Sequence, residues 1–300
     1  MKNDSIKTIS IESTKYPFRL KQIKRPPKKL YYRGNLEILQ KKYILAVVGT
    51  RLMTSYARQA LRYLIPEVAR REIVIVSGLA RGVDAYAHKL TLENGGKAVV
   101  VLAGGLDDIY PPEHTLFAEE IIKAGGLLLS EHSPGTDCLR QYFPARNRII
   151  SGISDAVLVV EAKQKSGALI TADFAFSQGR KVLAVPGSIF SEQSQGVNGL
   201  FQKGAIPVQS PEDLLKILFG WKNKRRIPRN EVNSHKTISL ASEEKQILEQ
   251  VPYDKPAPLN LLIRNANLPA AKVIAVATQL EIKGLIESAD GGYIKTLTIS

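Results

Sequence analysis

The sequence predicts an α/β fold, with a doubly wound and mostly parallel Rossmann-like sheet and a small C-terminal winged-helix domain. Two observations predict the sheet: short runs rich in Val, Ile and Leu recur between residues 44 and 187, and helical stretches separate them. Continuous apolar runs indicate strands that are buried on both faces. A third observation, three helical segments followed by two short strands after residue 240, predicts the winged helix.

On these grounds the chain divides into four segments. Residues 1–43 contain three prolines and a Tyr-Tyr pair, which favours an extended, basic lead-in packed on the sheet domain. Residues 44–219 are expected to form the Rossmann-like domain. Residues 220–239 are basic, polar and without periodicity, as is typical of a linker, and residues 240–300 are expected to form the winged-helix domain.

The repeated alternation of strand and helix predicts parallel strands. Strands are expected at 44–49, 73–78, 98–105, 126–131, 156–162 and 181–187, with helices at 56–70, 84–94 and 113–124. Nearly every strand ends in a turn of small or polar residues, so a ligand is expected at the carboxyl edge of the sheet. In the last segment, helices are expected at 242–250, 259–265 and 269–282, before two strands joined by a turn at 289–292.

The positive charge of the chain is concentrated outside the expected sheet. The formal net charge is +14, and residues 1–44 hold 12 Lys and Arg against 3 acidic residues, while residues 220–239 hold 6 against 1. Residues 45–219 are nearly balanced, with 18 against 17. The surplus suits a polyanionic partner such as nucleic acid, and a solvated basic linker gives the same count.

Composition excludes several classes of protein. A single cysteine, Cys138, allows no intramolecular disulfide, and four histidines without a second cysteine leave no familiar zinc spacing. No apolar stretch has the length of a transmembrane helix, and the polar start lacks the apolar core of a signal peptide. We therefore expect a cytoplasmic protein with no membrane contact, no metal and no cofactor.

Two of the expected turns suit phosphate. Gly49-Thr50-Arg51 follows the first strand and offers a close backbone approach, a hydroxyl and a planar guanidinium. The next turn precedes a helix N-terminus, which favours anions, and supplies Ser77, Gly78, Arg81 and Gly82. For the first turn the alternative is an ordinary surface arginine in a turn between strand and helix. For Asp84 and His88 the alternative is a helix N-cap and its partner on the helix surface.

Two further segments complete the candidate site. In residues 141–148 an aromatic ring lies beside basic and amide side chains, which suits stacking on a base and contact with phosphate along a flexible strand. These candidates are Phe143, Arg146, Asn147 and Arg148. Alternatively, Phe143 belongs to the core and the arginines are solvated. The turn after the fifth strand adds Ser166, Gly167 and Thr171, small residues on which a phosphate fits.

No enzymatic motif is found in the sequence. The serine-hydrolase elbow, the zinc-protease motif, the Walker A loop and the dinucleotide fingerprint after the first strand are all missing. We therefore expect a binding protein rather than an enzyme.

Taken in order, these turns resemble the DNA-processing protein A family (DprA, also called Smf). The resemblance covers about two-thirds of the chain, including AVVGTR (46–51), VSGLARGVDAYAH (76–88), FPARNRIISGISDAVLVVEA (143–162) and SGALITADFA (166–175). It implies a non-enzymatic cytoplasmic protein that dimerises, binds and protects single-stranded DNA, and helps load RecA recombinase in natural transformation. One departure is His114, where members of the family usually have Asn.

An alternative comes from the lysine-decarboxylase-like (LOG) proteins, which bind or hydrolyse nucleotides on a related fold. Those proteins have a Gly-rich turn followed by Glu, and the turn in this chain, SGALITADFA, lacks the Glu.

A dimer interface is expected near the end of the sheet domain. In residues 211–219 apolar side chains cover more of a helix circumference than docking on a sheet requires. The candidate interface residues are Leu200, Phe201, Leu214 and Leu218. Alternatively, the N-terminal segment or the winged helix covers this surface within one chain.

Overall fold

The computed structural model describes residues 6–220, 240–253, 256–289 and 291–296. They form a sheet domain and a C-terminal winged-helix domain, each with its own hydrophobic core. The fold predicted from the sequence is confirmed. The expected linker at 220–239 lies outside the described residues, apart from Gly220.

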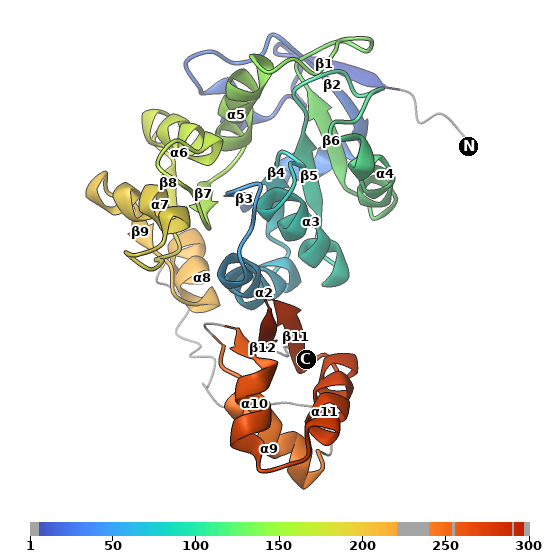
Figure 1. The fold of residues 1–300 in the computed structure, drawn as a ribbon. Coiled ribbons are helices and arrows are strands. Elements are labelled where there is room, and N and C mark those ends of the chain that lie inside the picture. The colour runs from blue at the N-terminus through green and yellow to red at the C-terminus, as the bar shows by residue number, and fades with distance from the viewer. Residues whose placement is uncertain (1–5, 221–239, 254–255, 290, 297–300) are drawn as a thin grey trace. The chain divides into compact units, whose positions relative to one another are not determined.

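The sheet domain contains one mixed sheet (Figure 1). Among the described residues its strand order is β1-β2-β6-β5-β4-β3-β7-β8-β9. From β3 to β6 each successive strand lies further toward one edge of the sheet, and from β7 to β9 each lies further toward the other edge. The strand order therefore reverses between β3 and β7, which are paired. The strands are β1 (Lys7–Ser10), β2 (Lys29–Gly34), β3 (Ile44–Val48), β4 (Val74–Ser77), β5 (Ala98–Val101), β6 (Leu127–Ser130), β7 (Ala156–Val159), β8 (Lys181–Ala184) and β9 (Ile206–Pro207).

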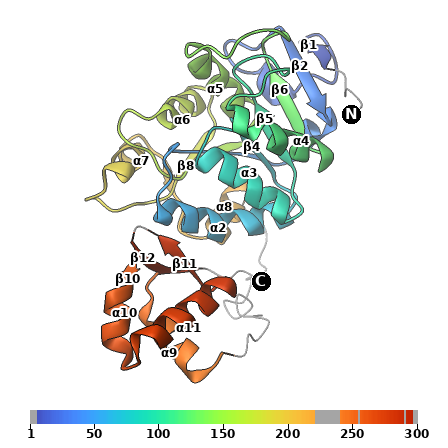
Figure 2. The same ribbon diagram turned by 45° about the vertical axis from the view of Figure 1, so that its right-hand side comes forward.

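The helices cover both faces of this sheet. Alternate residues of each central strand point to opposite sides: Val99 and Val101 belong to one cluster, with residues of α5, α6 and α7, and Val100 belongs to the other, with residues of α4. Figures 1 and 2 show α5 and α6 on one side and α3 and α4 on the other. The helices are α1 (Phe18–Lys21), α2 (Ser55–Arg70), α3 (Val83–Glu93), α4 (Thr115–Lys123), α5 (Tyr142–Gly152), α6 (Gly167–Ser177), α7 (Glu192–Gln202) and α8 (Pro211–Phe219), with short 3₁₀ helices η1 (Leu36–Gln40) and η2 (Pro112–His114).

The N-terminal segment differs from the expected extended lead-in. It supplies β1 and β2, and β2 pairs antiparallel with β6. Ile9 and Leu30 point into the core, while their neighbours along each strand are exposed or half-buried. Because only alternate positions are buried, these strands lack the continuous apolar run by which the parallel strands were predicted.

Two of the four residues predicted for a dimer interface are buried within the chain itself. Leu200 is 2% exposed and belongs to the main core, and Leu214 is fully buried. Neither side chain is available to a second copy, so the prediction is wrong for these two. Phe201 and Leu218 are half-buried, and Phe219 packs edge-to-face against Tyr43 of the N-terminal segment, with 4.5 Å between ring centroids.

The winged-helix domain contains the three predicted helices and the predicted hairpin (Figure 2). A short third strand, which the sequence analysis did not predict, completes its sheet. Its elements are α9 (Ser242–Gln250), β10 (Ala257–Pro258), α10 (Leu259–Ala266), α11 (Ala270–Ile282), β11 (Ile286–Ala289) and β12 (Gly292–Lys295). Among the described residues, no helix of either domain is long and apolar enough to cross a membrane.

Candidate nucleic-acid interface

A cavity of about 510 Å³ opens at the carboxyl edge of the sheet, where the strand order reverses. It lies among the turns after β3 and β7 and the first turns of α5 and α6. Nine of the fourteen predicted nucleic-acid-binding residues line it: Gly49, Thr50, Arg51, Phe143, Arg146, Asn147, Ser166, Gly167 and Thr171. The expectation that a ligand site lies at this edge thus agrees with the geometry.

The N-terminus of α6 forms one wall of the cavity. Ser166 is its N-cap, and the Ser166 Oγ accepts a hydrogen bond from the N–H of Ala168 at 3.3 Å. The side chain of Asn147 donates to the carbonyl of Gly167 at 3.2 Å and so ties α5 to this turn. The first turn of α6 contains no acidic residue. The helix dipole and the remaining free N–H groups therefore favour an anion in the cavity.

Arg51 and Phe143 form the opposite wall. The Arg51 guanidinium carbon lies 5.3 Å from the centre of the Phe143 ring. In the described part of the chain Arg51 has no carboxylate within ion-pair distance, and its side chain is exposed. Phe143 also meets Tyr110 edge-to-face, with centroids 5.8 Å apart. A half-buried ring next to an unpaired cation can accept a base on its face and a phosphate beside it.

Arg146 supplies a fixed positive charge at the floor of the cavity. Its guanidinium donates to the carbonyl of Gly78 at 3.0 Å and to that of Val101. Burial lowers the pKa of Arg146 to about 10, and the negative charge of Asp84 opposes this shift. The side chain therefore remains charged at neutral pH. Because its guanidinium is held by two carbonyls, Arg146 attracts an anion in the cavity through its charge and is not free to move toward a ligand.

In the turn between β4 and α3, several of the predicted residues stabilise the turn itself. Gly82 has φ +77° and is the N-cap of α3, and a Cβ there would collide with the carbonyl of Thr50. Asp84 is therefore not the N-cap. It is buried and accepts the N–H of Gly78 at 3.1 Å, and burial raises its pKa. Ser77 is also buried and donates to the carbonyl of Val47 at 2.6 Å.

His88 and His114 lie close to this turn. His88 is fully buried, so it is not a surface partner of Asp84. Burial, reinforced by the electrostatic effect of the neighbouring His114, lowers the pKa of His88 to about 3. The Nδ1 of His114 lies 2.8 Å from the carbonyl of Leu79 and donates to it. The histidine that departs from the family pattern thus holds the β4–α3 turn in place.

Arg148 and Arg81 are engaged with carboxylates of the chain. Arg148 is absent from the cavity lining, its side chain is 15% exposed, and it donates to both oxygens of Glu131, at 2.6 and 2.5 Å. The described geometry therefore gives the predicted DNA contact of Arg148 no support, and that contact stays a prediction. Arg81 pairs with Glu113 at the surface and lines, with Gly78, a second small cavity beside Phe143.

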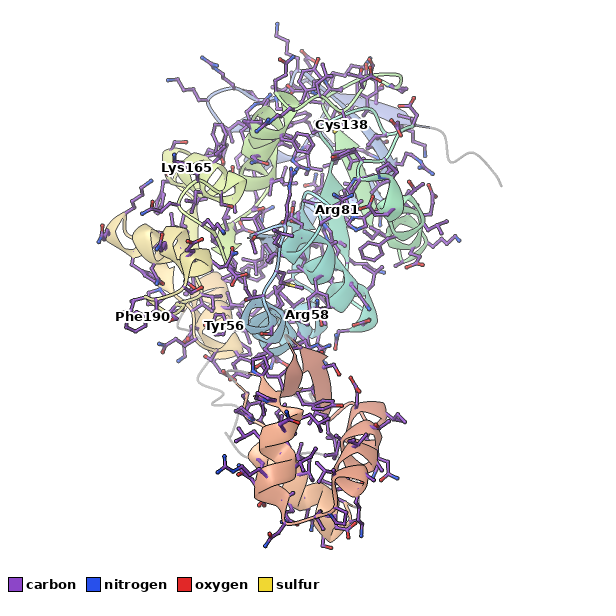
Figure 3. The ribbon with its side chains drawn as sticks, viewed as in Figure 1. Tyr56, Arg58, Arg81, Cys138, Lys165 and Phe190 are labelled. Carbon is purple, nitrogen blue, oxygen red and sulfur yellow. The ribbon has the colours of Figure 1, made fainter. Side chains whose placement is uncertain are left out.

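Two lysines of the cavity were missed by the sequence analysis. Lys163 and Lys165 come from the turn between β7 and α6, immediately before Ser166. Lys163 pairs with Glu192 at 3.1 Å, whereas Lys165 is exposed and, within the described ranges, makes no ion pair. Figure 3 labels Lys165 and Arg81, which come from turns on opposite sides of β3. The sequence does contain a signal for these lysines, because the segment EAKQKSG places both of them directly after a buried strand. Within the described residues no cluster of His, Cys, Asp and Glu could hold a metal ion.

The chain matches known protein families over most of its length. The family described as DNA recombination-mediator protein A matches residues 7–219, and the DprA winged helix domain matches residues 234–292. The DNA processing protein DprA of Bacillus subtilis is 44% identical over 217 residues, which are 72% of this chain and 73% of that protein. Protein Smf of Escherichia coli is 38% identical over 96% of this chain and 76% of its own length.

Two solved structures share the fold. DNA processing protein A of Streptococcus pneumoniae is 41% identical, with a TM-score of 0.66 over 70% of this chain and 74% of that one. DNA processing protein A of Helicobacter pylori is 31% identical, with a TM-score of 0.65 over 72% of this chain and 97% of that one. The latter structure is described as showing a single-stranded DNA binding mode.

Proposed function

The chain belongs to the family of DNA recombination-mediator protein A, and from this premise we propose that it binds single-stranded DNA in the cavity at the carboxyl edge of its sheet. The observation that carries the proposal is the meeting of unpaired cations, a helix N-terminus and an aromatic ring around one cavity. Within the described residues the unpaired cations are Arg51 and Lys165.

Each part of the cavity suits one part of a nucleotide strand. A phosphate fits at the N-terminus of α6, between Arg51 and Lys165. A base fits against Phe143, whose ring is already flanked by Arg51 and Arg146 at 5.3 and 5.8 Å. A duplex hides the faces of its bases by stacking, so this arrangement favours single strands. The description of the H. pylori structure supports the same ligand class.

We extend the proposal to the cellular role implied by the family. The protein protects incoming single-stranded DNA and helps load RecA recombinase during natural transformation, as a cytoplasmic homodimer and without enzymatic activity. The family's description as a recombination mediator and the names of the relatives support this role.

The test is the salt dependence of binding to a fluorescent oligo-dT. Arg51→Ala and Lys165→Ala are each expected to weaken binding and to reduce the slope of log K against log[salt] by about 0.7, the contribution of one phosphate contact on a single strand. Lys89→Ala is the matched control, because Lys89 is an exposed cation in the second half of α3, which leads away from the cavity. Slopes equal to the wild type in both cavity variants would contradict the proposed site.

Mononucleotides provide a second arm of this test. The cavity volume of about 510 Å³ could also hold one nucleotide, as the LOG-like alternative requires. Under our proposal dTMP competes weakly with the oligonucleotide and is not hydrolysed. Micromolar binding with release of the base or phosphate would favour the alternative.

A further inference from the structure

The loop between β8 and α7 exposes two adjacent apolar side chains. Phe190 is 92% exposed and Ile189 is 77% exposed. Among the large apolar side chains of the described residues, Phe190 is the most exposed. Neither residue has a role in the cavity derived above. Two neighbouring apolar side chains held in water indicate a surface that is covered by a partner.

The backbone of this loop is fixed. Asn198 on α7 accepts the N–H of Gly187 at 3.2 Å and donates to its carbonyl at 3.0 Å. Ser188 accepts the N–H of Phe190 on its Oγ at 3.3 Å and that of Ser191 on its carbonyl at 3.1 Å. The loop therefore presents its two apolar side chains on a preformed turn, which reduces the entropy lost when they are covered.

The same loop adjoins the cavity. Glu192, two residues after Phe190, pairs with Lys163, and Gln193 lines the cavity itself. Three extended residues span at most about 11 Å, so Phe190 begins within that distance of a cavity-lining residue. The exposed Lys165 comes from the neighbouring turn, and Figure 3 shows Lys165 and Phe190 on the same flank of the sheet domain.

We propose that Phe190, with Ile189 beside it, is a second stacking platform for a base of the single strand, on the β8 side of the cavity. The inference rests on the proposed function, because it describes where the single-stranded DNA that occupies the cavity continues beyond it. Cations at the cavity and an exposed ring beyond them match a polymer in which phosphates and bases alternate. A purely apolar partner would not account for the two lysines that line the neighbouring cavity, Lys163 and Lys165.

The inference predicts a dependence on strand length. A dinucleotide of dT occupies little more than the cavity, whose volume suits one nucleotide, whereas an oligo-dT of about twelve nucleotides also extends to Phe190. Phe190→Ala is therefore expected to leave the affinity for the short strand unchanged and to lower that for the long strand about fivefold or more, as expected for the loss of one stacked base.

The full chain offers a matched control. Phe18 is 69% exposed and lies in α1, next to Arg19, which pairs with Asp155 at the amino ends of β3 and β7. Phe18→Ala is expected to bind both strands like the wild type. Phe190→Trp in a Trp221→Phe background is expected to retain affinity, and its fluorescence is expected to be quenched by the long strand but not by the short one.

Three other experimental results would contradict the stacking role of Phe190 or the proposed function. If Phe190→Ala binds both strands like the wild type, or loses affinity for both equally, the stacking platform is wrong. If sedimentation shows that Phe190→Ala changes the oligomeric state, a second copy covers the loop and the inference is also wrong. If instead Arg51→Ala and Lys165→Ala bind both strands like the wild type, the proposed function itself fails.

Discussion

Two arginines of one motif have different surroundings, because a helix turns by about 100° per residue. Arg146 and Arg148 are two positions apart on α5 and therefore point in nearly opposite directions. Arg146 reaches the floor of the cavity, and Arg148 reaches Glu131 on the other side. The sequence showed that both lie in one basic segment. It could not show the rotation of α5 against the sheet, which decides which arginine faces the ligand.

At the same scale, Phe143 should distinguish single strands from duplexes. Phe143→Ala is expected to weaken binding to oligo-dT by about 1–3 kcal/mol, because a stacked base is lost, and to leave the weaker binding of duplex DNA nearly unchanged. Parallel titrations of both substrates measure this difference. Phe143→Tyr keeps the ring and serves as the control. Equal losses on both substrates would assign the ring of Phe143 to the core of the protein.

At the scale of the element, the sequence predicted best those strands whose residues are all buried. All four residues of β4, β5, β6 and β7 are buried, and each strand begins with at least three consecutive apolar residues in the sequence. β2 pairs at the antiparallel margin of the sheet and β9 has two residues, so neither leaves such a run. Lys163 and Lys165 were missed for a related reason. A turn has no periodicity, and its side chains become neighbours of Arg51 through strand order alone.

Helix α3 should make stability depend on pH through His88. The native pKa of about 3 lies far below the ordinary value of 6.5, mainly because His88 is buried. As the pH falls below 6.5 the unfolded chain binds a proton that the native state rejects. The contribution of His88 to the free energy of unfolding is therefore fully present above pH 6.5. As the pH falls from 6.5 toward 3, the free energy of unfolding decreases by about 1.4 kcal/mol per pH unit because of this group.

The variant His88→Leu fills the site with a side chain that cannot titrate. Urea unfolding between pH 6.5 and 4.5 is expected to show a slope of the unfolding free energy that is shallower by about 1.4 kcal/mol per pH unit than in the wild type. Comparing slopes rather than absolute stabilities removes the effect of the change in packing. Parallel slopes would mean that His88 is protonated in the native protein over this range.

At the scale of the whole molecule, the distribution of ion pairs matters more than the net charge of +14. Away from the cavity, several cations are matched by carboxylates, as in Arg33 with Glu119 and Arg71 with Glu67. At the cavity, Arg51 and Lys165 remain unpaired among the described residues. The charge balance of residues 45–219 therefore conceals a local positive site. Composition alone could not show it, because pairing depends on which side chains the fold brings together.

Self-association, the remaining part of the proposed function, should depend on the outer face of α8. Leu214 and Leu215 on this helix are buried, whereas Leu218 is half-exposed. In a homodimer two DNA cavities share one particle, so a long strand that engages both gains effective concentration and a short strand does not. Leu218→Arg is expected to give a folded monomer by sedimentation, with a larger loss of affinity for long strands than for short ones. Leu116→Arg, at a 79% exposed position on α4, is expected to remain dimeric. A wild-type chain that sediments as a monomer at tens of micromolar would contradict the homodimer.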